Sequence, residues 1–247
     1  MITQTRRDLT LIHGFANKSL VIACDTCAAV GEKDGDILNL PAHYVGKFTS
    51  RVALTEVMCS GAKPITLING AANEMQPTAE AFIQGIQEEL KNADITDIVL
   101  TGSTEENFTT NMTALAVTVI GVASEDELKF KKASKGDKLV LLGSPKVGAE
   151  VDLDSVGFYS EIKKLLCISG VKEIVPVGSK GVAYEAENLA LINGMAVSFY
   201  DTPADLHKSA GPATCIVVLC SEDAVSQVLD VCLDACVVGE FLHINKA

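Results

Sequence analysis

Short apolar runs and apolar–polar alternations recur along the first half of the chain. They predict five strands, at 9–12, 20–23, 65–68, 98–101 and 114–122. Between them the apolar spacing changes to three and four residues, which is typical of helices. One helix is expected from Val45 to Ala62, and a second from Pro77 to about Asn92, with Phe82, Ile86 and Leu90 as its core stripe.

The second half of the chain repeats the same mixture of strands and helices. Strands are expected at 138–142, 171–177, 214–219 and 237–244, and helices at 162–166, 184–193 and 221–235. A highly charged stretch at 124–137 separates the two halves. We therefore predict an α/β (α+β) protein with two domains, residues 1–124 and 135–247.

Composition narrows the classes of protein that this chain can be. Of its 247 residues, 48% are apolar and 21% charged, which supports a folded core. No apolar run reaches the roughly 18 residues of a membrane span, and the first residues do not look like a secretory signal. The net charge of -12, without a cluster of Lys and Arg, argues against nucleic acid as a partner. We expect a cytoplasmic protein that binds neither nucleic acid nor membranes.

The eight cysteines allow two interpretations. Cys24 and Cys27 form a CxxC pair, and Cys232 and Cys236 form a CxxxC pair, so a zinc site is conceivable. Reduced thiols that pack as small apolar side chains are the simpler interpretation, and we prefer it.

Acidic residues are concentrated between Asp25 and Glu106, beside glycines and other small residues. Asp25 closes the second strand and Asp8 precedes the first, so each is either a metal ligand at a loop mouth or a turn residue. Residues 28–40 are rich in Gly and Asp, and we expect them to form a mobile loop. Such a setting suits a metal-bound polyphosphate.

Two glycine-containing loops follow strands and offer phosphate contacts. The first spans Gly102–Asn107 and carries hydroxyl and carboxylate groups; the second, 178–181, carries Ser179 and Lys180. In both cases a plain polar turn is the alternative. The sequence after Gly143 lacks the Lys and Ser/Thr of a P-loop, and protein-kinase motifs are absent.

The strings GKFTSRVALTEVMCSGAKP, LTGSTEENF, GDKLVLLG and CIVVLCSEDAVSQVL together resemble one known family. This is the aminoimidazole ribonucleotide synthetase (PurM-like) superfamily, which includes thiamine-monophosphate kinase, selenophosphate synthetase and a hydrogenase maturation protein. Residues 61–64, Gly-Ala-Lys-Pro, match the family's helix motif, and Glu56 stands where its metal-binding Asp is expected. In the later Gly-Gly-Asp-Thr motif the Asp is replaced, so Glu105 or Glu106 must substitute.

The chain is most similar to the α-ribazole kinase branch, through VGEKDGD, LTGSTEENF, SPKVGAEV and PVGSKGVAYEA. The resemblance implies an ATP- and Mg²⁺-dependent kinase that phosphorylates the 5′-hydroxyl of α-ribazole in salvage of the cobalamin lower ligand. It also implies a homodimer whose N-terminal domains pair into a β-barrel with flanking helices, and a smaller C-terminal α/β domain that helps shape the substrate site.

The resemblance assigns metal binding to Asp25, Glu56 and Glu105, with Asp8 and Glu106 as second choices. Residues expected to contact ATP are Lys33, Lys47, Gly102, Ser103, Thr104 and Asn107.

Asp8 or Asp36 is a candidate base for the acceptor hydroxyl, and Ser179 and Lys180 are candidates for contact with the nucleoside. Another phosphotransferase or synthetase of the same superfamily, such as one like thiamine-phosphate kinase, and a non-catalytic nucleotide-binding protein of the same fold remain alternatives.

Overall fold

The computed structural model describes residues 1–15 and 17–244, and the chain divides into two compact units. Unit 1 consists of Met1–Met58 and Ala62–Glu125. Unit 2 contains the short segment Cys59–Gly61 and the chain from Asp126 onward. The predicted domains, 1–124 and 135–247, differ from these units in the linker and in the placement of Cys59–Gly61.

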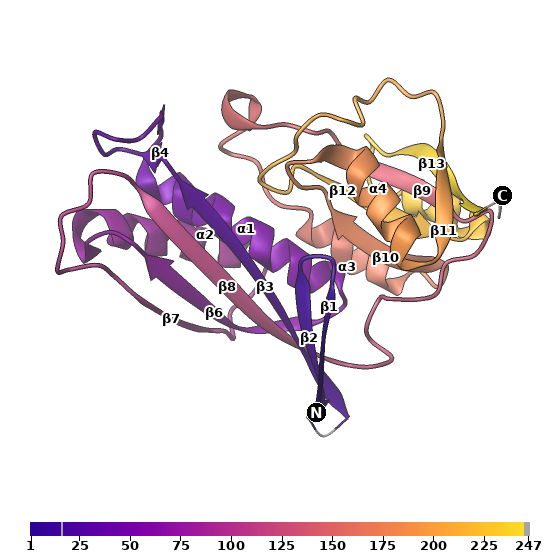
Figure 1. Ribbon diagram of the computed structural model, residues 1–247, viewed down its shortest axis with the longest axis horizontal. Helices are drawn as coiled ribbons and strands as arrows, with labels where there is room; N and C mark the ends of the chain where they lie inside the picture. The colour runs from indigo at the N-terminus through magenta and orange to yellow at the C-terminus, as the bar shows by residue number, and fades with distance from the viewer. Residues whose placement is uncertain (16, 245–247) are drawn as a thin grey trace. The chain divides into compact units, whose positions relative to one another are not determined.

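Unit 1 is built on a six-stranded sheet with the order β1-β2-β3-β8-β6-β7 (Figure 1). Its strands are β1 (Ile2–Arg6), β2 (Leu9–Phe15), β3 (Lys18–Ala28), β6 (Lys63–Ala71), β7 (Val99–Ser103) and β8 (Ala114–Ser124). Within this sheet only β6 and β7 pair in parallel, among the described strands, and helix α2 (Glu80–Asn92) lies between them in the chain. Buried and half-exposed residues alternate strictly along β8, so one face of the sheet carries the core.

Helices α1 (Ala42–Cys59) and α2 (Glu80–Asn92) cover that face (Figure 1), and a π-helical turn at Met75–Ala79 precedes α2. The two helices can approach closely because Gly46 and Gly85 have no side chains. A Cβ at Gly46 would meet the Phe82 backbone at 2.1 Å, and one at Gly85 would meet the His43 carbonyl at 1.9 Å. The expected core stripe of α2, Phe82, Ile86 and Leu90, is buried.

No helix of unit 1, within the described residues, covers the opposite face of the sheet (Figure 1). Cross-strand pairing aligns Ile22, Ile120 and Thr66 on this open face, and all three are half-exposed. One copy of the chain therefore has an open sheet and no barrel in the described residues. The barrel expected from the resemblance would need a second copy.

Unit 2 contains a five-stranded sheet with the order β10-β12-β9-β13-β11, in which all neighbours are antiparallel. The strands are β9 (Lys138–Gly143), β10 (Val171–Pro176), β11 (Met195–Phe199), β12 (Cys215–Cys220) and β13 (Cys236–His243). Its helices are α3 (Tyr159–Cys167), α4 (Gly181–Ile192) and α5 (Val225–Leu229), with 3₁₀ turns at Gly148–Glu150 and Glu222–Ala224.

The sheet of unit 2 is covered on both faces, which explains why every residue of β12 is buried. Val182 and Leu189 of α4 pack in one core with Leu139 and Leu141 of β9. The alternate residues of the strands face the other side, where α3 contacts β10 and α5 contacts β9 and β12. This arrangement resembles that of an α/β layer.

The helix expected at 221–235 is much shorter than predicted. Its α-helical part ends at Leu229, and Ser221 makes no side-chain capping hydrogen bond. Only Val228 of α5 is buried, and Leu233 is fully exposed, so a longer helix would have no apolar stripe to bury.

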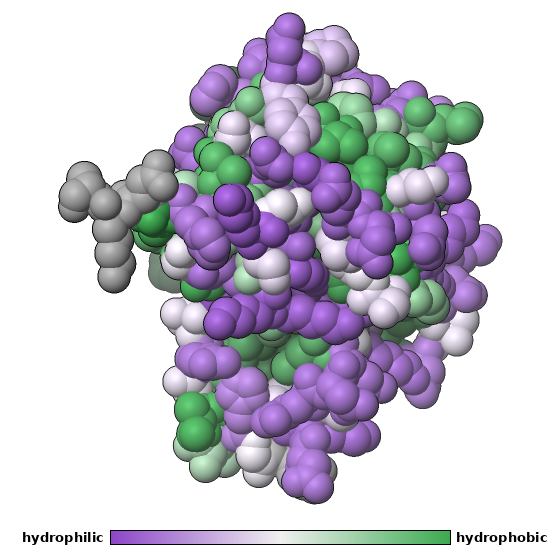
Figure 2. Space-filling view, turned by 90° about the vertical axis from the view of Figure 1, so that its right-hand side faces the viewer, coloured by the Kyte–Doolittle hydropathy of each residue, from purple (hydrophilic) through white to green (hydrophobic). Residues whose placement is uncertain are grey.

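Among the described helices, none combines the length and the apolar content that crossing a membrane requires. Hydrophilic side chains cover most of the face drawn in Figure 2, with apolar side chains in smaller groups between them.

Candidate active site

Asp25 lies near the end of β3, on the same face as the buried Val21 and Ala23. Burial raises the pKa of Asp25 to about 6; a hydrogen bond from the backbone of Thr26 lowers it, and the negative charge of Asp8 raises it further. Asp8 occupies the turn between β1 and β2. The two predicted acids are therefore close enough to repel each other, and a cation between them would relieve that repulsion.

Cys27 is the next residue on this face of β3, and the charges of two of the predicted acids act on it. Burial raises the pKa of its thiol, and the charges of Asp25 and Asp36 raise it further, while a hydrogen bond from Thr49 of α1 lowers it. The structure thus brings Asp8, Asp25 and Asp36 to one end of β3.

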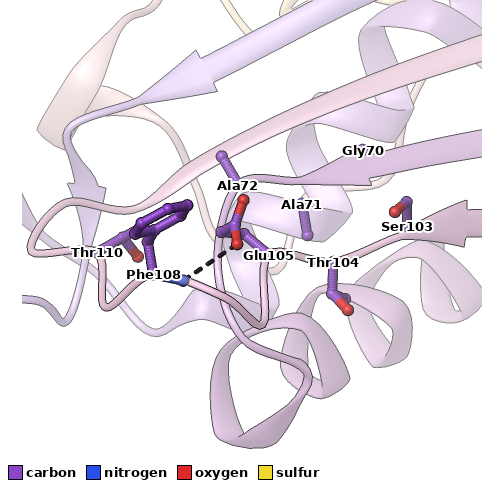
Figure 3. Close-up of a pocket in the computed structure, with 8 residues that line it drawn as sticks. All are labelled: Gly70, Ala71, Ala72, Ser103, Thr104, Glu105, Phe108 and Thr110. Atoms are coloured by element: carbon purple, nitrogen blue, oxygen red, sulfur yellow. Dashed lines mark hydrogen bonds between the residues drawn. The ribbon is translucent and has the colours of Figure 1, made fainter.

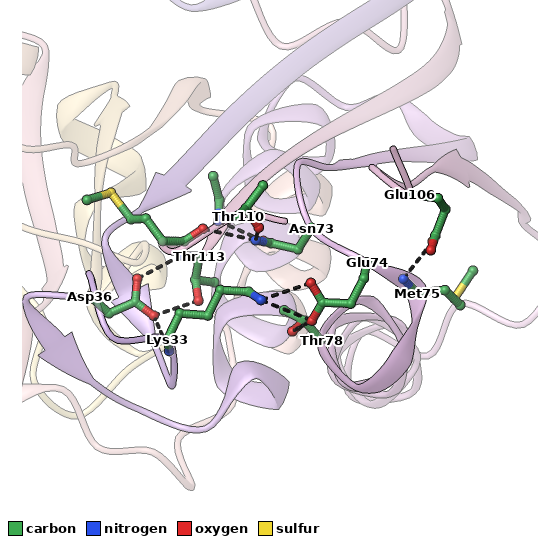
Figure 4. A network of polar contacts seen from close by, with 11 residues as sticks. Lys33, Asp36, Asn73, Glu74, Met75, Thr78, Glu106, Thr110 and Thr113 are labelled. Atoms are coloured by element: carbon green, nitrogen blue, oxygen red, sulfur yellow. Dashed lines mark hydrogen bonds and ion pairs between the residues drawn. The ribbon is translucent and has the colours of Figure 1, made fainter. Parts of the chain in front are cut away.

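Asp36 is held by three hydrogen bonds (Figure 4). Its oxygens accept from the N–H of Thr113 at 2.8 Å, from the Thr113 hydroxyl at 2.6 Å and from the N–H of Lys33 at 2.9 Å. Burial alone raises the pKa of Asp36, but these bonds outweigh it and leave the pKa below its usual value. A carboxylate held in this way is a weak base.

The segment around Asp36 was expected to form a mobile loop, but it is tied to the start of β8. Short strands β4 (Val30–Gly31) and β5 (Leu38–Asn39) pair within it, and the N–H of Gly35 donates to the Asn111 carbonyl at 2.7 Å. A Cβ at Gly31 would meet the Thr113 hydroxyl at 2.0 Å, so the close packing here requires glycine. Any opening of this segment must break these contacts.

Lys33 forms an ion pair with Glu74, a residue that the sequence did not single out (Figure 4). The Lys33 Nζ lies 2.8 Å and 3.1 Å from the two carboxylate oxygens, and the Thr78 hydroxyl donates to the same group. Burial raises the pKa of Glu74, but the bonds from Lys33 and Thr78 outweigh it, and the pKa is lowered. The cation predicted to reach a phosphate is thus already beside a carboxylate partner, which it would have to exchange.

The carboxylates of the loop after β7 hold backbone groups. The Glu105 Oε1 accepts from the N–H of Asn107 at 2.7 Å and of Phe108 at 3.2 Å. The Glu106 Oε1 accepts from the N–H of Met75 and from the Thr104 hydroxyl, both at 2.8 Å. Either residue would have to give up these bonds to bind a metal through the same oxygen.

Asn73 is the fully buried centre of this region, and sequence reasoning missed it. Its Nδ2 donates to the Thr110 hydroxyl at 2.7 Å and to the Met112 carbonyl at 2.9 Å, and its Oδ1 accepts from the N–H of Ala114. Its own carbonyl accepts from the N–H of Glu105. Asn73 therefore fixes both ends of the loop that joins β7 to β8.

A cavity of about 500 Å³ opens beside this loop (Figure 3), lined by Gly70, Ala71, Ala72, Ser103, Thr104, Glu105, Phe108 and Thr110. A second hollow of about 410 Å³ lies next to it on the open face of the sheet, with Gly70 and Ser103 in both. Gly102 lines only the second, and a Cβ there would meet the Asn69 carbonyl at 2.3 Å. Three of the predicted ATP contacts, Gly102, Ser103 and Thr104, therefore line adjoining hollows.

Glu56 and Lys47 lie on α1 and have partners within unit 1. Glu56 accepts a bond from Arg7 at 3.2 Å, and Lys47, with only 3% of its side chain exposed, lies 2.7 Å from Glu88 of α2. Both charges are neutralised by these pairs. In the described residues no three His, Cys, Asp or Glu side chains are grouped closely enough to hold a metal ion by themselves.

Ser179 and Lys180 are exposed in unit 2, at the turn before α4. The Lys180 Nζ lies 4.3 Å from the centre of the Tyr184 ring and 3.2 Å from its hydroxyl.

The CxxC pair does not form a joint metal site. Cys24 and Cys27 are three residues apart on β3, so their side chains lie on opposite faces of the sheet.

Residues 10–123 match the model of the AIR synthase related protein family, N-terminal domain. The matched residues include Asp25, Lys33 and the whole loop from Gly102 to Asn107. No curated protein is similar enough in sequence to match the chain.

Solved structures share the fold of both units. HypE in the HypE–HypF complex aligns with a TM-score of 0.73 at 17% identity, over 95% of this chain and 87% of that chain. HypE from E. coli, a hydrogenase maturation protein, aligns at 0.67 and 18%, over 90% of this chain and 80% of that one.

PurL from T. maritima in complex with ATP aligns with this chain at a TM-score of 0.70 and 15% identity. The alignment covers 95% of this chain but only 42% of PurL. At such identities these likenesses establish the fold. None of them bears on the α-ribazole kinase branch, which stays a prediction.

Proposed function

We propose that the protein is an ATP- and Mg²⁺-dependent kinase that acts on a small molecule. The observation that carries this is the pair Asp25 and Asp8: burial, and to a smaller extent the negative charge of Asp8, raise the pKa of Asp25 to about 6. A carboxylate with a perturbed pKa beside a second carboxylate is typical of a functional site. At neutral pH most of Asp25 is ionised, so the pair attracts a cation.

The donor set fits Mg²⁺. In nucleotide sites this ion is commonly held by one or two carboxylates together with phosphate oxygens and water, and a cage of three protein ligands is not needed. Asp25 and Asp8 are therefore assigned to Mg²⁺. Glu56 is bonded to Arg7, and Glu105 and Glu106 hold the loop after β7, so we rank these three below the Asp pair.

Phosphoryl transfer mainly requires positioning and neutralisation of charge, and the bound Mg²⁺ supplies much of that neutralisation. Ser103 and Thr104 offer hydroxyl donors beside the cavity, and Lys33 would leave Glu74 to pair with a phosphate. Asp36 is a poor base because its hydrogen bonds lower its pKa. Asp8, the other candidate base, is assigned to Mg²⁺, so neither candidate is retained as the base for the acceptor proton.

The proposed acceptor is the 5′-hydroxyl of α-ribazole, with Ser179 and Lys180 contacting the nucleoside. The resemblance of LTGSTEENF and PVGSKGVAYEA supports this choice of substrate. The proposed assembly is a homodimer in which the open face of the sheet, including Ile22 and Ile120, pairs with a second copy to close the barrel. Half-exposed aliphatic side chains in the middle of a sheet support such a contact.

Phosphorus NMR tests the proposal. Purified protein with ATP, Mg²⁺ and α-ribazole is expected to give ADP and a new phosphomonoester signal, and omission of Mg²⁺ is expected to remove both. A product with thiamine monophosphate instead would indicate another kinase of the superfamily. ATP binding without any product would support the non-catalytic alternative.

A further inference from the structure

We infer that Phe108 stacks on a planar heteroaromatic ring bound in the cavity of about 500 Å³, and so selects nucleoside-containing ligands. This inference rests on the proposed nucleotide site and adds the residue that recognises the base. Two sources carry such a ring: the adenine of ATP and the base of the acceptor nucleoside.

The first observation is the exposure of Phe108. Its side chain lines the cavity while the residue is 76% exposed. Single exposed apolar residues are common, so exposure alone is no argument. Here, however, an aromatic face is presented at the edge of a cavity, where a planar ligand would cover it.

The second observation is that the loop holds Phe108 in place. Its N–H donates to the Glu105 carboxylate (Figure 3). The N–H of Glu105 in turn donates to the carbonyl of the buried Asn73. Asn73 also binds Thr110, on the other side of Phe108. The phenyl ring therefore projects from a segment fixed on both sides, and little conformational entropy is lost when a ligand stacks on it.

The third observation is the composition of the cavity wall. Gly70, Ala71 and Ala72 have side chains of at most one carbon, which leaves room for a flat ring. Ser103 and Thr110 supply polar groups along the rim. Aromatic side chains bind nucleobases by stacking because every base has a π-face, and a few polar groups then fix orientation.

The chain contains no tryptophan, which allows a direct test. Phe108→Trp introduces the only tryptophan of the chain at the proposed stacking position, and its emission can be excited separately from that of the four tyrosines. ATP with Mg²⁺, or α-ribazole, is expected to quench its emission in a saturable manner, whereas inorganic tripolyphosphate with Mg²⁺ is not. Quenching by ATP identifies adenine as the ring, and quenching by α-ribazole alone identifies the acceptor base.

Ile2→Trp is the matched control, because Ile2 is 69% exposed and lies on β1, at the opposite edge of the same sheet from β7. No quenching is expected there. Phe108→Ala provides a measurement without a fluorophore: calorimetry is expected to show binding of the stacked ligand weakened on the order of tenfold.

The inference is overturned if neither ligand quenches Phe108→Trp, if tripolyphosphate quenches as strongly as ATP, or if Phe108→Ala binds both ligands as the wild type does. These readouts do not depend on turnover. A kinase that phosphorylates α-ribazole without quenching would disprove the stacking alone, and quenching without any product would disprove the kinase alone.

Discussion

At the scale of single residues, the site depends on Asp25, a carboxylate whose ionised form is disfavoured in the folded protein. Asp25 is partly buried and is acted on by the negative charge of Asp8, and both effects raise its pKa to about 6 from 3.8. The protonated form therefore stabilises the folded state fully below about pH 4, and this contribution is lost as the pH rises through about 6. A loss of folding stability at neutral pH, such as the one caused by ionised Asp25, is typical of functional positions.

Asp25→Asn is expected to raise the free energy of unfolding at pH 7.5 while it abolishes ATP turnover. The amide mimics the neutral acid, so the gain is expected to shrink as the pH falls from 6 to 4, where wild-type Asp25 becomes protonated. Urea unfolding at several pH values measures this. Asp34→Asn, at an exposed position in the segment near Asp36, is the control and is expected to change neither property.

If Asp25→Asn were instead less stable than the wild type at pH 7.5, Asp25 would have a stabilising partner, and its assignment as an unfavourable, metal-seeking charge would be wrong.

Asp8, Asp25, Lys33 and Asp36 could be predicted from the sequence, because charged residues in glycine-containing segments or beside strands can be recognised there. Sequence reasoning missed Asn73 and Glu74, which come from the chain between β6 and α2. Their importance arises from contacts with residues more than thirty positions away, such as Thr110 and Lys33. Neither composition nor local periodicity carries that information.

At the scale of elements, α1 and α2 are joined by charge as well as by apolar packing. The Arg51 Nε donates to the Glu89 Oε1 at 2.7 Å, with 2% and 0% of the two side chains exposed. The guanidinium also lies 4.8 Å from the Phe48 ring centre. A charge buried so deeply is tolerated only while its partner is present.

Arg51→Met is expected to lower the free energy of unfolding by about 3–5 kcal/mol, because it leaves the Glu89 carboxylate buried without its cation. The double variant Arg51→Met/Glu89→Leu is expected to recover most of that loss, since it removes both charges. Denaturant unfolding measures both. A double variant no more stable than the single one would show that the pair contributes through packing rather than through charge.

The elements themselves were largely predictable where the apolar pattern was strong. The strictly alternating strand β8 begins where it was predicted and runs two residues further, to Ser124, and the stripe of α2 falls within its predicted range. β1 was missed because all five of its residues are polar or exposed, and it forms through backbone pairing with β2. The last helix was overestimated because the pattern of 221–235 was extended beyond the point where a buried stripe ends.

At the scale of the whole molecule, the resemblance supplied the architecture that local patterns could not. The HypE and PurL structures share the fold of both units, although their sequences are less than 20% identical to this chain. Strand order is set by long-range pairing, so β3 next to β8 and β6 next to β7 could not be derived from periodicity.

Ile120→Glu is expected to convert a dimer into a monomer in sedimentation velocity, because it places a charge on the open face of the six-stranded sheet. Val156→Glu, at an exposed position in unit 2, is expected to leave the dimer intact. A wild-type protein that sediments as a monomer at all concentrations would contradict the proposed barrel.

The central claim is that Asp25 serves Mg²⁺-dependent transfer of phosphate from ATP to a small acceptor. The most direct measurement is phosphorus NMR on wild-type protein and Asp25→Asn, each with ATP, Mg²⁺ and α-ribazole. We predict a phosphomonoester signal and ADP with the wild type, and neither with the variant. A wild type that forms no phosphomonoester, or a variant that forms it at the wild-type rate, would contradict the claim.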